Sequence, residues 1–200
     1  MFDVFLAFGL AYLLGSFPSA YLVARAKGQN IFTVGSGNMG AMNTARNLSW
    51  GWGAVVLLTD IIKGSLATWL ALQIGGSNML PAFAASFAVV LGHCYSIFIN
   101  FKGGKGLATA LGASIAIYPW LGIAGLTGII LLSLGIKGRS NLAASVLAVS
   151  YPVLAAIFLT QRGWSGSAFI WAMVSIVLYS SVILIKYLPD VRSELLPQAD

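Results

Sequence analysis

The sequence has very few charged residues for its length, and this shortage excludes most soluble folds. Only 8% of its 200 residues are charged, whereas 58% are hydrophobic. A soluble domain carries about a quarter charged residues, because its surface faces water. A chain this poor in charge cannot cover a water-facing surface. The bilayer is therefore its expected solvent, and residues 1–200 are expected to form a single polytopic membrane domain.

Cysteine and histidine are almost absent, which limits the chemistry that the chain can support. Cys94 is the single cysteine, so an internal disulfide and a multi-cysteine metal site are excluded. His93 is the single histidine, which argues against most zinc and di-iron chemistry. We therefore expect no metal and no cofactor, and we interpret Cys94 as a small buried residue rather than a nucleophile.

Acidic residues are also scarce, with five Asp and Glu against eleven Lys and Arg and a net charge of +6. In a membrane protein such an excess usually lies in cytoplasmic loops, and it suits an anionic substrate or a lipid headgroup. Nucleic acid is not an expected partner, because no basic helix or aromatic RNA platform is present. The N-terminus shows no basic n-region and no small-residue cleavage site, so the first apolar segment is expected to remain as a helix.

Long apolar runs fill most of the sequence and predict an all-α integral membrane protein with about seven transmembrane helices. Each such helix needs about 20 mostly apolar residues. The run 107–118 is too short to cross, so it forms a short or tilted helix or else re-enters the same side and leaves six spans. The predicted spans are 2–24, 50–73, 80–101, 107–118, 120–136, 142–160 and 168–188.

The basic residues predict the orientation of these spans. With seven spans, all the Lys and Arg residues of the loops except Arg162 lie on the same side of the membrane. The side rich in Lys and Arg is expected to face the cytoplasm. The N-terminus is then outside and the C-terminus cytoplasmic. Six spans would move Lys137 and Arg139 to the outside, which is a worse partition. The residues that seven spans place together are Arg25, Lys27, Arg46, Lys102, Lys105, Lys137, Arg139, Lys186 and Arg192.

The longest polar segment, 27–49, holds the first candidate phosphate site. Its glycines permit positive φ, and exposed backbone amides form anion-binding nests. Ser and Asn side chains add neutral donors, and Arg46 adds a planar fork for phosphate oxygens. A polar turn that caps a helix is the alternative. The candidate ligands are Gly35, Ser36, Gly37, Asn38, Asn43 and Arg46.

A second candidate loop, 101–107, places lysines and glycines directly before a predicted helix. Mobile positive charge, free amides and the positive end of the helix dipole all favour phosphate. The loop is not a Walker A motif, because Gly106 follows Lys105 where Ser or Thr is needed. A basic topology anchor is the alternative, although an anchor does not need this many glycines. The candidate ligands are Lys102, Gly103, Gly104, Lys105 and Gly106.

Asp60, Lys63 and His93 are ionisable residues that fall well inside predicted spans. Asp60 and Lys63 lie three residues apart and share one helix face. We favour a structural ion pair between them over a role for Lys63 at the phosphate site. His93 has no obvious catalytic partner in the sequence, so a structural role is favoured over that of a donor or a base.

Several polar motifs resemble a known bacterial enzyme family. They are GSFPSAYLVAR (15–25), GSGNMGAMNTAR (35–46), LLTDIIKG (57–64) and GHCYSIFINFKGGKGLATALG (92–112). In order and spacing they are similar to the acyl-phosphate:glycerol-3-phosphate acyltransferase family, called PlsY. The resemblance implies a seven-span enzyme of the bacterial cytoplasmic (inner) membrane whose active site faces the cytoplasm. Such an enzyme moves a fatty acyl group from acyl phosphate to the 1-hydroxyl of glycerol 3-phosphate, giving lysophosphatidic acid for phospholipid biosynthesis.

The resemblance also assigns candidate roles and partners. Ser36, Arg46, His93 and Lys105 are the candidate catalytic residues, and no metal or thiol is needed. The expected partners are acyl phosphate, glycerol 3-phosphate and membrane lipid, and the chain is expected to act as a monomer. The alternative is a divergent non-catalytic paralogue, or a binder or transporter of a phosphate-bearing lipid or metabolite, although no transporter-like internal repeat is visible.

The C-terminal part departs from the family pattern, as does Ser96, which stands where a proline is usual. Asn141 occupies a position where a serine is usual, and Tyr187 and Asp190 replace the histidine and asparagine of the last motif. Asn141, Tyr187 and Asp190 are therefore possible C-terminal site residues.

The change to aspartate predicts a local rearrangement. An ionised Asp190 close to a phosphate would repel it, so the carboxylate must pair with a cation, stay protonated or point away. Lys186, one helical turn earlier, is the expected partner. Pro189 is expected to end the last helix early and to move Tyr187 and Asp190 out of the site.

Overall fold

The computed structural model describes residues 1–136 and 139–196, and over these residues the regular structure is helical apart from an isolated bridge between Ser96 and Lys102. Lys137, one of the basic residues that predicted the orientation, lies outside the described residues. The α-helices are α1 Phe2–Gly15, α2 Ser19–Ala26, α3 Ala41–Asn47, α4 Trp50–Gly75, α5 Leu80–Cys94, α6 Leu107–Ile117, α7 Pro119–Gly135, α8 Ser140–Gln161 and α9 Gly166–Leu195, and a 3-10 turn covers Ile97–Ile99.

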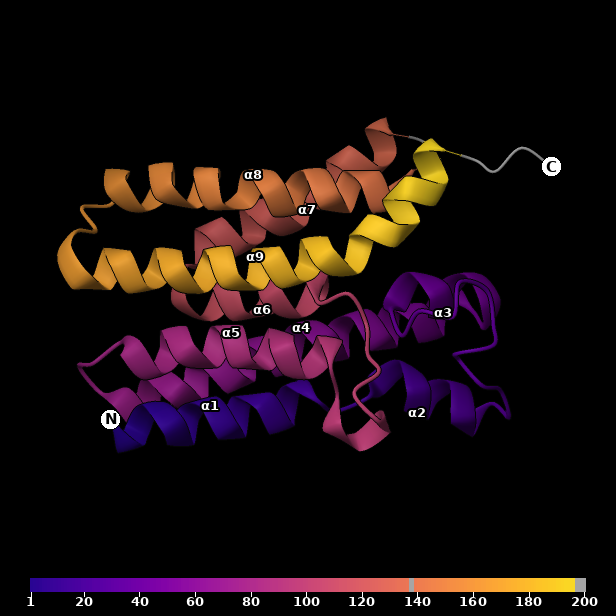
Figure 1. Ribbon diagram of the computed structural model, residues 1–200, viewed down its shortest axis with the longest axis horizontal. Helices are drawn as coiled ribbons and strands as arrows, with labels where there is room; N and C mark the ends of the chain where they lie inside the picture. Colours follow the sequence, from indigo (N-terminus) through magenta and orange to yellow (C-terminus); the bar gives the residue numbers. More distant parts are fainter. Residues whose placement is uncertain (137–138, 197–200) are drawn as a thin grey trace.

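The long helices lie side by side in two groups, with α6 between them (Figure 1). In one group α5 packs against α1 and α4, and in the other α8 packs against α7 and α9; α6 joins α4 to α7. Small residues bring these helices close together. A Cβ added to Gly15 would lie 2.1 Å from the Val89 carbonyl oxygen, and one added to Gly112 would lie 2.2 Å from that of Ile61. Close backbone approach of this kind is typical of helices that associate in a membrane.

Large apolar side chains on the outside of the bundle support a membrane location. Leu58, Val153 and Ile170 are each at least half exposed, as are many other large apolar residues on the long helices. Over the described residues four segments are long and apolar enough to cross a bilayer, namely 2–26, α4, α8 and α9. The helices α5, α6 and α7 are shorter. The 11 residues of α6 span about 16 Å against a hydrocarbon core of about 30 Å.

The prediction of one continuous span over 80–101 is wrong, because α5 ends at Cys94. The chain then turns back through Asn100 and Phe101, both with positive φ. The Ser96 hydroxyl holds this turn against the break between α1 and α2, since it donates to the Ser16 carbonyl oxygen at 2.5 Å. Ser16 lies in the break between α1 and α2, so the first predicted span is also interrupted.

The prediction that Pro189 ends the last helix is also wrong, because α9 continues to Leu195. Proline removes one backbone hydrogen bond and bends a helix that continues past it. The last turns of α9 bend away from the axis of the rest of the helix and approach the start of α8 (Figure 1). Tyr187 and Asp190 therefore stay close to the predicted site.

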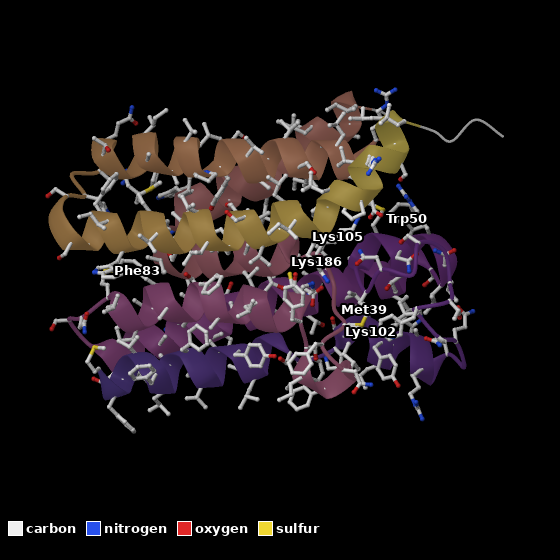
Figure 2. The ribbon with its side chains drawn as sticks, in the orientation of Figure 1. Met39, Trp50, Phe83, Lys102, Lys105 and Lys186 are labelled. Carbon is white, nitrogen blue, oxygen red and sulfur yellow. The ribbon has the colours of Figure 1, made fainter. Side chains whose placement is uncertain are left out.

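The polar loops gather at one end of the bundle. Figure 2 shows Lys102, Lys105 and Lys186 at the end that also carries Met39 and Trp50, whereas Phe83 lies towards the other end. The turn between α8 and α9, which contains Arg162, lies at that other end (Figure 1). The start of α1 and the end of α9 lie at opposite ends of the bundle, as an odd number of crossings requires.

Candidate functional site

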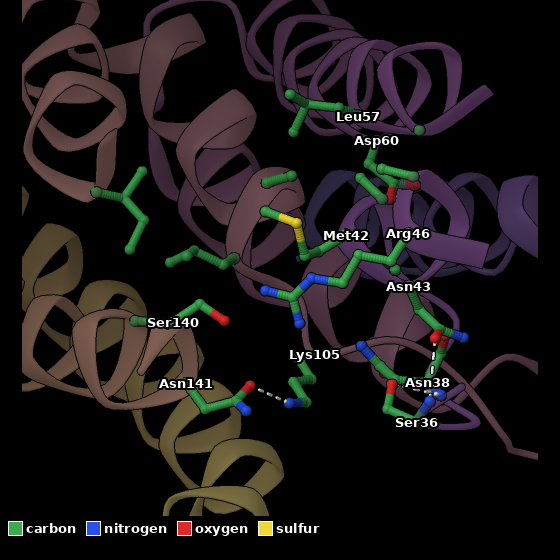
Figure 3. Close-up of a pocket in the computed structure, with 18 of the residues that line it drawn as sticks. Ser36, Asn38, Met42, Asn43, Arg46, Leu57, Asp60, Lys105, Ser140 and Asn141 are labelled. Atoms are coloured by element: carbon green, nitrogen blue, oxygen red, sulfur yellow. Dashed lines mark hydrogen bonds between the residues drawn. The ribbon is translucent and has the colours of Figure 1, made fainter. Parts of the chain in front are cut away.

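A cavity of about 730 Å³ lies where the two polar loops meet the ends of α8 and α9. Its wall carries both polar and apolar side chains, and helices from both groups contribute to it (Figure 3). The polar residues include Ser36, Asn38, Asn43, Arg46, Asp60, His93, Lys105, Asn141 and Asp190. The apolar residues include Met42, Trp50, Leu57, Leu107, Leu111, Leu126 and Ile129. This combination suits a ligand with an anionic head and an apolar chain.

Asn43 organises the first loop from inside. Its Nδ2 donates to the carbonyl oxygens of Val34 and Asn38, both at 3.0 Å. Its Oδ1 accepts from the Ser36 backbone amide at 3.1 Å and from Asn47 Nδ2 at 2.9 Å. Because both ends of this buried amide are occupied within the loop, Asn43 shapes the loop and has no donor left for a phosphate.

Gly35 has a positive φ of 58°, and a Cβ there would lie 2.2 Å from Asn47 Nδ2 and 2.4 Å from Asn43 Oδ1. Glycine at this position therefore allows the loop to close around Asn43. The closed loop presents Ser36, Asn38 and Arg46 to the cavity. In Figure 3 the Arg46 guanidinium extends from α3 into the space next to Lys105. Over the described residues, no carboxylate oxygen lies within 4.0 Å of it.

The glycines of the second loop serve packing as well as flexibility. A Cβ on Gly104 would lie 2.2 Å from His93 Nε2, and one on Gly103 would lie 2.2 Å from the His93 carbonyl oxygen. The Gly104 amide donates to that same oxygen at 3.1 Å. Gly106 has a φ of 86° at the residue before α6. Glycine density here thus lets the loop lie directly on the end of α5.

Lys105 is the centre of the polar wall, and its side chain is only 11% exposed. Its Nζ donates to Asn141 Oδ1 at 2.6 Å and forms a short ion pair with Asp190 Oδ2. It also lies over the Tyr187 ring, 4.3 Å from the ring centroid, which is a cation–π contact. All three C-terminal residues that depart from the family pattern therefore meet at Lys105.

These contacts correct one prediction about Asp190. The carboxylate does pair with a cation, but the partner is Lys105 and not Lys186, whose Nζ lies 4.7 Å from the centre of the Tyr95 ring. The bend at Pro189 turns Asp190 towards the second loop. Tyr187 contacts Lys105 with the face of its ring, which a histidine would do less well.

A buried polar network borders the cavity and is centred on Asp60, which lines it. Asp60 Oδ1 accepts from Lys63 Nζ and from the Ser19 hydroxyl, both at 2.9 Å. Lys63 also donates to the Phe17 carbonyl oxygen at 3.1 Å. These contacts tie α4 to the break between α1 and α2, as a structural ion pair would. Lys63 is not among the described residues of the cavity wall.

His93 has a partner that the sequence did not reveal. Its Nδ1 lies 3.6 Å from Asp60 Oδ1, while Nε2 packs against Gly104. A residue 33 positions away in the chain gives no local spacing signal, so the pairing needed the fold. Cys94, next to it, is fully buried, as expected of a small core residue.

The loops contribute unequally to the cavity. Of the candidate ligands, Gly35, Ser36, Asn38, Asn43, Arg46, Lys105 and Gly106 line it. Lys102, Gly37, Gly103 and Gly104 are not among the described residues of its wall. Lys102 is exposed and lies over the Phe32 ring at 5.4 Å, outside the lining. Sequence reasoning missed Ser140 and Ser193, which reach the wall only because α8 and α9 meet there.

The chain matches known proteins over almost its whole length. Residues 5–193 match the family model for glycerol-3-phosphate acyltransferase. Glycerol-3-phosphate acyltransferase 1 of Dehalococcoides mccartyi is 37% identical over 191 residues, which are 93% of this chain and 88% of that protein. The glycerol-3-phosphate acyltransferase of Thermus thermophilus is 46% identical over 114 residues, and that alignment covers 57% of each chain.

Solved structures agree with these matches. The crystal structure of PlsY, an integral membrane glycerol 3-phosphate acyltransferase, in its glycerol 3-phosphate form superposes with a TM-score of 0.86 at 28% identity. The superposition covers 98% of this chain and 94% of that one. The lysophosphatidic acid form gives a TM-score of 0.83 at 27% identity. The family match over residues 5–193 and the shared architecture show that this chain belongs to the glycerol-3-phosphate acyltransferase family.

Proposed function

We propose that this chain transfers a fatty acyl group from acyl phosphate to the 1-hydroxyl of glycerol 3-phosphate, giving lysophosphatidic acid and phosphate. Membership of the family supports the activity and the acceptor. The single observation that carries the proposal is the mixed lining of the cavity, in which the cations Arg46 and Lys105 occur together with apolar residues such as Leu57, Leu111 and Leu126. The cations would hold phosphate, and the apolar residues would hold the acyl chain.

The phosphate ligands that we propose are the cavity-lining donors of the two loops. Arg46 offers a bidentate fork, and Ser36 and Asn38 add neutral donors beside it. Lys105 supplies the second positive charge. We assign Asn43 to the shape of the first loop, because its amide is fully hydrogen-bonded there. We assign His93 to the support of the second loop, because its ring lies between Asp60 and Gly104.

In the proposed reaction the 1-hydroxyl oxygen attacks the acyl carbon and the bond from that carbon to the phosphate oxygen breaks. The hydroxyl proton passes to a phosphate oxygen, so no side-chain base is required. Arg46 and Lys105 would stabilise the negative charge of the departing phosphate. Holding both substrates in one cavity supplies much of the acceleration, since the reaction becomes effectively unimolecular.

The membrane arrangement that we propose has seven crossings, with the N-terminus outside and the cavity at the cytoplasmic face of a bacterial inner membrane. The apolar exterior and the gathering of lysines at the cavity end support it. The helices α5, α6 and α7 are shorter than the hydrocarbon core is thick, and they would cross where the bilayer becomes thinner around them.

The direct test uses the purified chain in detergent with radiolabelled glycerol 3-phosphate. Acyl phosphate, acyl-CoA and acyl carrier protein are supplied separately as donors. We expect labelled lysophosphatidic acid with acyl phosphate alone. Product with a different donor would correct the donor assignment. No product with any of the three, while glycerol 3-phosphate still binds, would favour the non-catalytic binder.

A further inference from the structure

The last turns of α9 reach the start of α8 through Glu194, which belongs to none of the sequence motifs. Glu194 Oε1 accepts from Asn141 Nδ2 at 2.7 Å, and Oε2 accepts from the Leu142 backbone amide at 3.2 Å. The Asn141 backbone amide also points at Oε1, at 3.4 Å. The first turn of α8 has no side-chain cap from its own N-cap residue. The carboxylate of Glu194 therefore binds the amides that a helix start leaves unpaired.

These contacts fix the direction of the Asn141 side chain. A side-chain amide has one donor end and one acceptor end. Because Glu194 takes the donor end, the acceptor Oδ1 faces Lys105 Nζ, at 2.6 Å. In the flipped orientation the Asn141 amide nitrogen would face the Lys105 ammonium, and two hydrogen-bond donors would oppose each other. Asn141 lines the cavity, whereas Glu194 is not among the described residues of its wall.

We propose that Glu194 is a positioning residue for phosphate binding. It orients Asn141, and Asn141 holds the Lys105 ammonium where the phosphate of glycerol 3-phosphate binds; this inference rests on the proposed function. The negative charge of Glu194 is directed at the start of α8 and stays behind Asn141. It can therefore act on Lys105 without placing a second carboxylate next to the substrate.

The first test is Glu194→Gln in the full chain. Glutamine keeps the shape and one acceptor, but it also offers a donor and no longer forces the orientation of Asn141. We expect the KM for glycerol 3-phosphate to rise about fivefold to tenfold and kcat to change less than about twofold, because ground-state binding is weakened. Leu195→Ala, an exposed neighbour, is the matched control and should leave both values unchanged. Calorimetry without an acyl donor gives the Kd for glycerol 3-phosphate as a second readout.

A double-mutant cycle with Asn141→Ala separates positioning from a purely structural cap. If Glu194 acts through Asn141, Glu194→Gln should change the KM and Kd by less than about twofold in the Asn141→Ala background. Equal losses with and without Asn141, or unchanged values for Glu194→Gln alone, would overturn this inference and leave the proposed function intact. A wild type that neither binds glycerol 3-phosphate nor transfers acyl groups would overturn both.

Discussion

Lys105 and Arg46, the two cations of the cavity, differ in which groups of the protein balance their positive charge. This difference decides how each should respond to substitution. Lys105 is held by Asn141, Asp190 and the ring of Tyr187. Arg46 has no carboxylate within ion-pair distance over the described residues. A phosphate would therefore compete with Asp190 for the lysine, whereas no carboxylate of the described residues would compete with it for the guanidinium.

Removing the charge of Lys105 should weaken catalysis strongly. We expect Lys105→Met to lower kcat/KM for glycerol 3-phosphate by about tenfold to a hundredfold, because a charge-assisted hydrogen bond contributes about 1.5–3 kcal/mol. Lys102→Met is the matched control, since Lys102 lies outside the cavity lining. It should keep near-wild-type kinetics. Equal losses in both variants would show that overall loop charge, and not the position of Lys105, binds the substrate.

Neutralising Asp190 should have the opposite effect. Asp190→Asn removes a carboxylate that competes with the substrate for Lys105, so the KM for glycerol 3-phosphate should fall. Since the pair is partly exposed, we expect a change of about twofold to fivefold. Asp190→Glu keeps the charge and should retain the wild-type KM. A higher KM for Asp190→Asn would mean that the ion pair holds Lys105 in its active position.

Among the elements, the start of α2 and the middle of α4 depend on a buried ion pair. Asp60 is 2% exposed and Lys63 6% exposed. Asp60→Ala leaves the lysine uncompensated and should lower the free energy of unfolding by about 3–5 kcal/mol. The double variant Asp60→Leu with Lys63→Met should recover most of this loss, because no unpaired charge remains. Unfolding in detergent mixtures with increasing denaturant measures both; a stable single variant would contradict the structural role of the pair.

The second loop and the end of α5 depend on a glycine contact. Gly104→Ala places a methyl group 2.2 Å from His93 Nε2 and 2.6 Å from the Met39 carbonyl oxygen. The loop must move, so we expect a loss of about 1–3 kcal/mol in unfolding free energy together with lower activity. Gly128→Ala in α7 meets only Leu147 Cδ1 at 3.8 Å and should be tolerated. Unchanged stability of Gly104→Ala would show that the loop is mobile on α5.

At the scale of the whole molecule, the orientation in the membrane can be tested at two exposed positions, Gln29 after α2 and Gln161 at the end of α8. These two element ends lie at opposite ends of the bundle (Figure 1). In a Cys94→Ala background, we expect an impermeant thiol reagent to label Gln161→Cys from outside intact cells. Gln29→Cys should react only after the membrane is opened. Labelling of Gln29→Cys in intact cells would reverse the proposed topology.

Much of this protein follows from local sequence. The shortage of charge and the apolar runs predict an all-helical protein with an apolar exterior, because composition decides which solvent a surface can face. The starts of α4, α6 and α7 fall within one residue of the predicted spans. The motifs around Ser36, Arg46 and Lys105 identify the family correctly, and all three residues line one cavity.

The tertiary structure alone decided which residues far apart in the chain pair with one another. Asp60 meets His93, Asp190 meets Lys105 and Glu194 meets Asn141. No periodicity or spacing predicts such contacts, because they depend on which helices pack together and where a helix bends. The glycines of the second loop show the same limit of sequence-based prediction. The sequence indicates that the backbone of this loop approaches another part of the chain closely. Only the packing of the helices shows that this part is the end of α5.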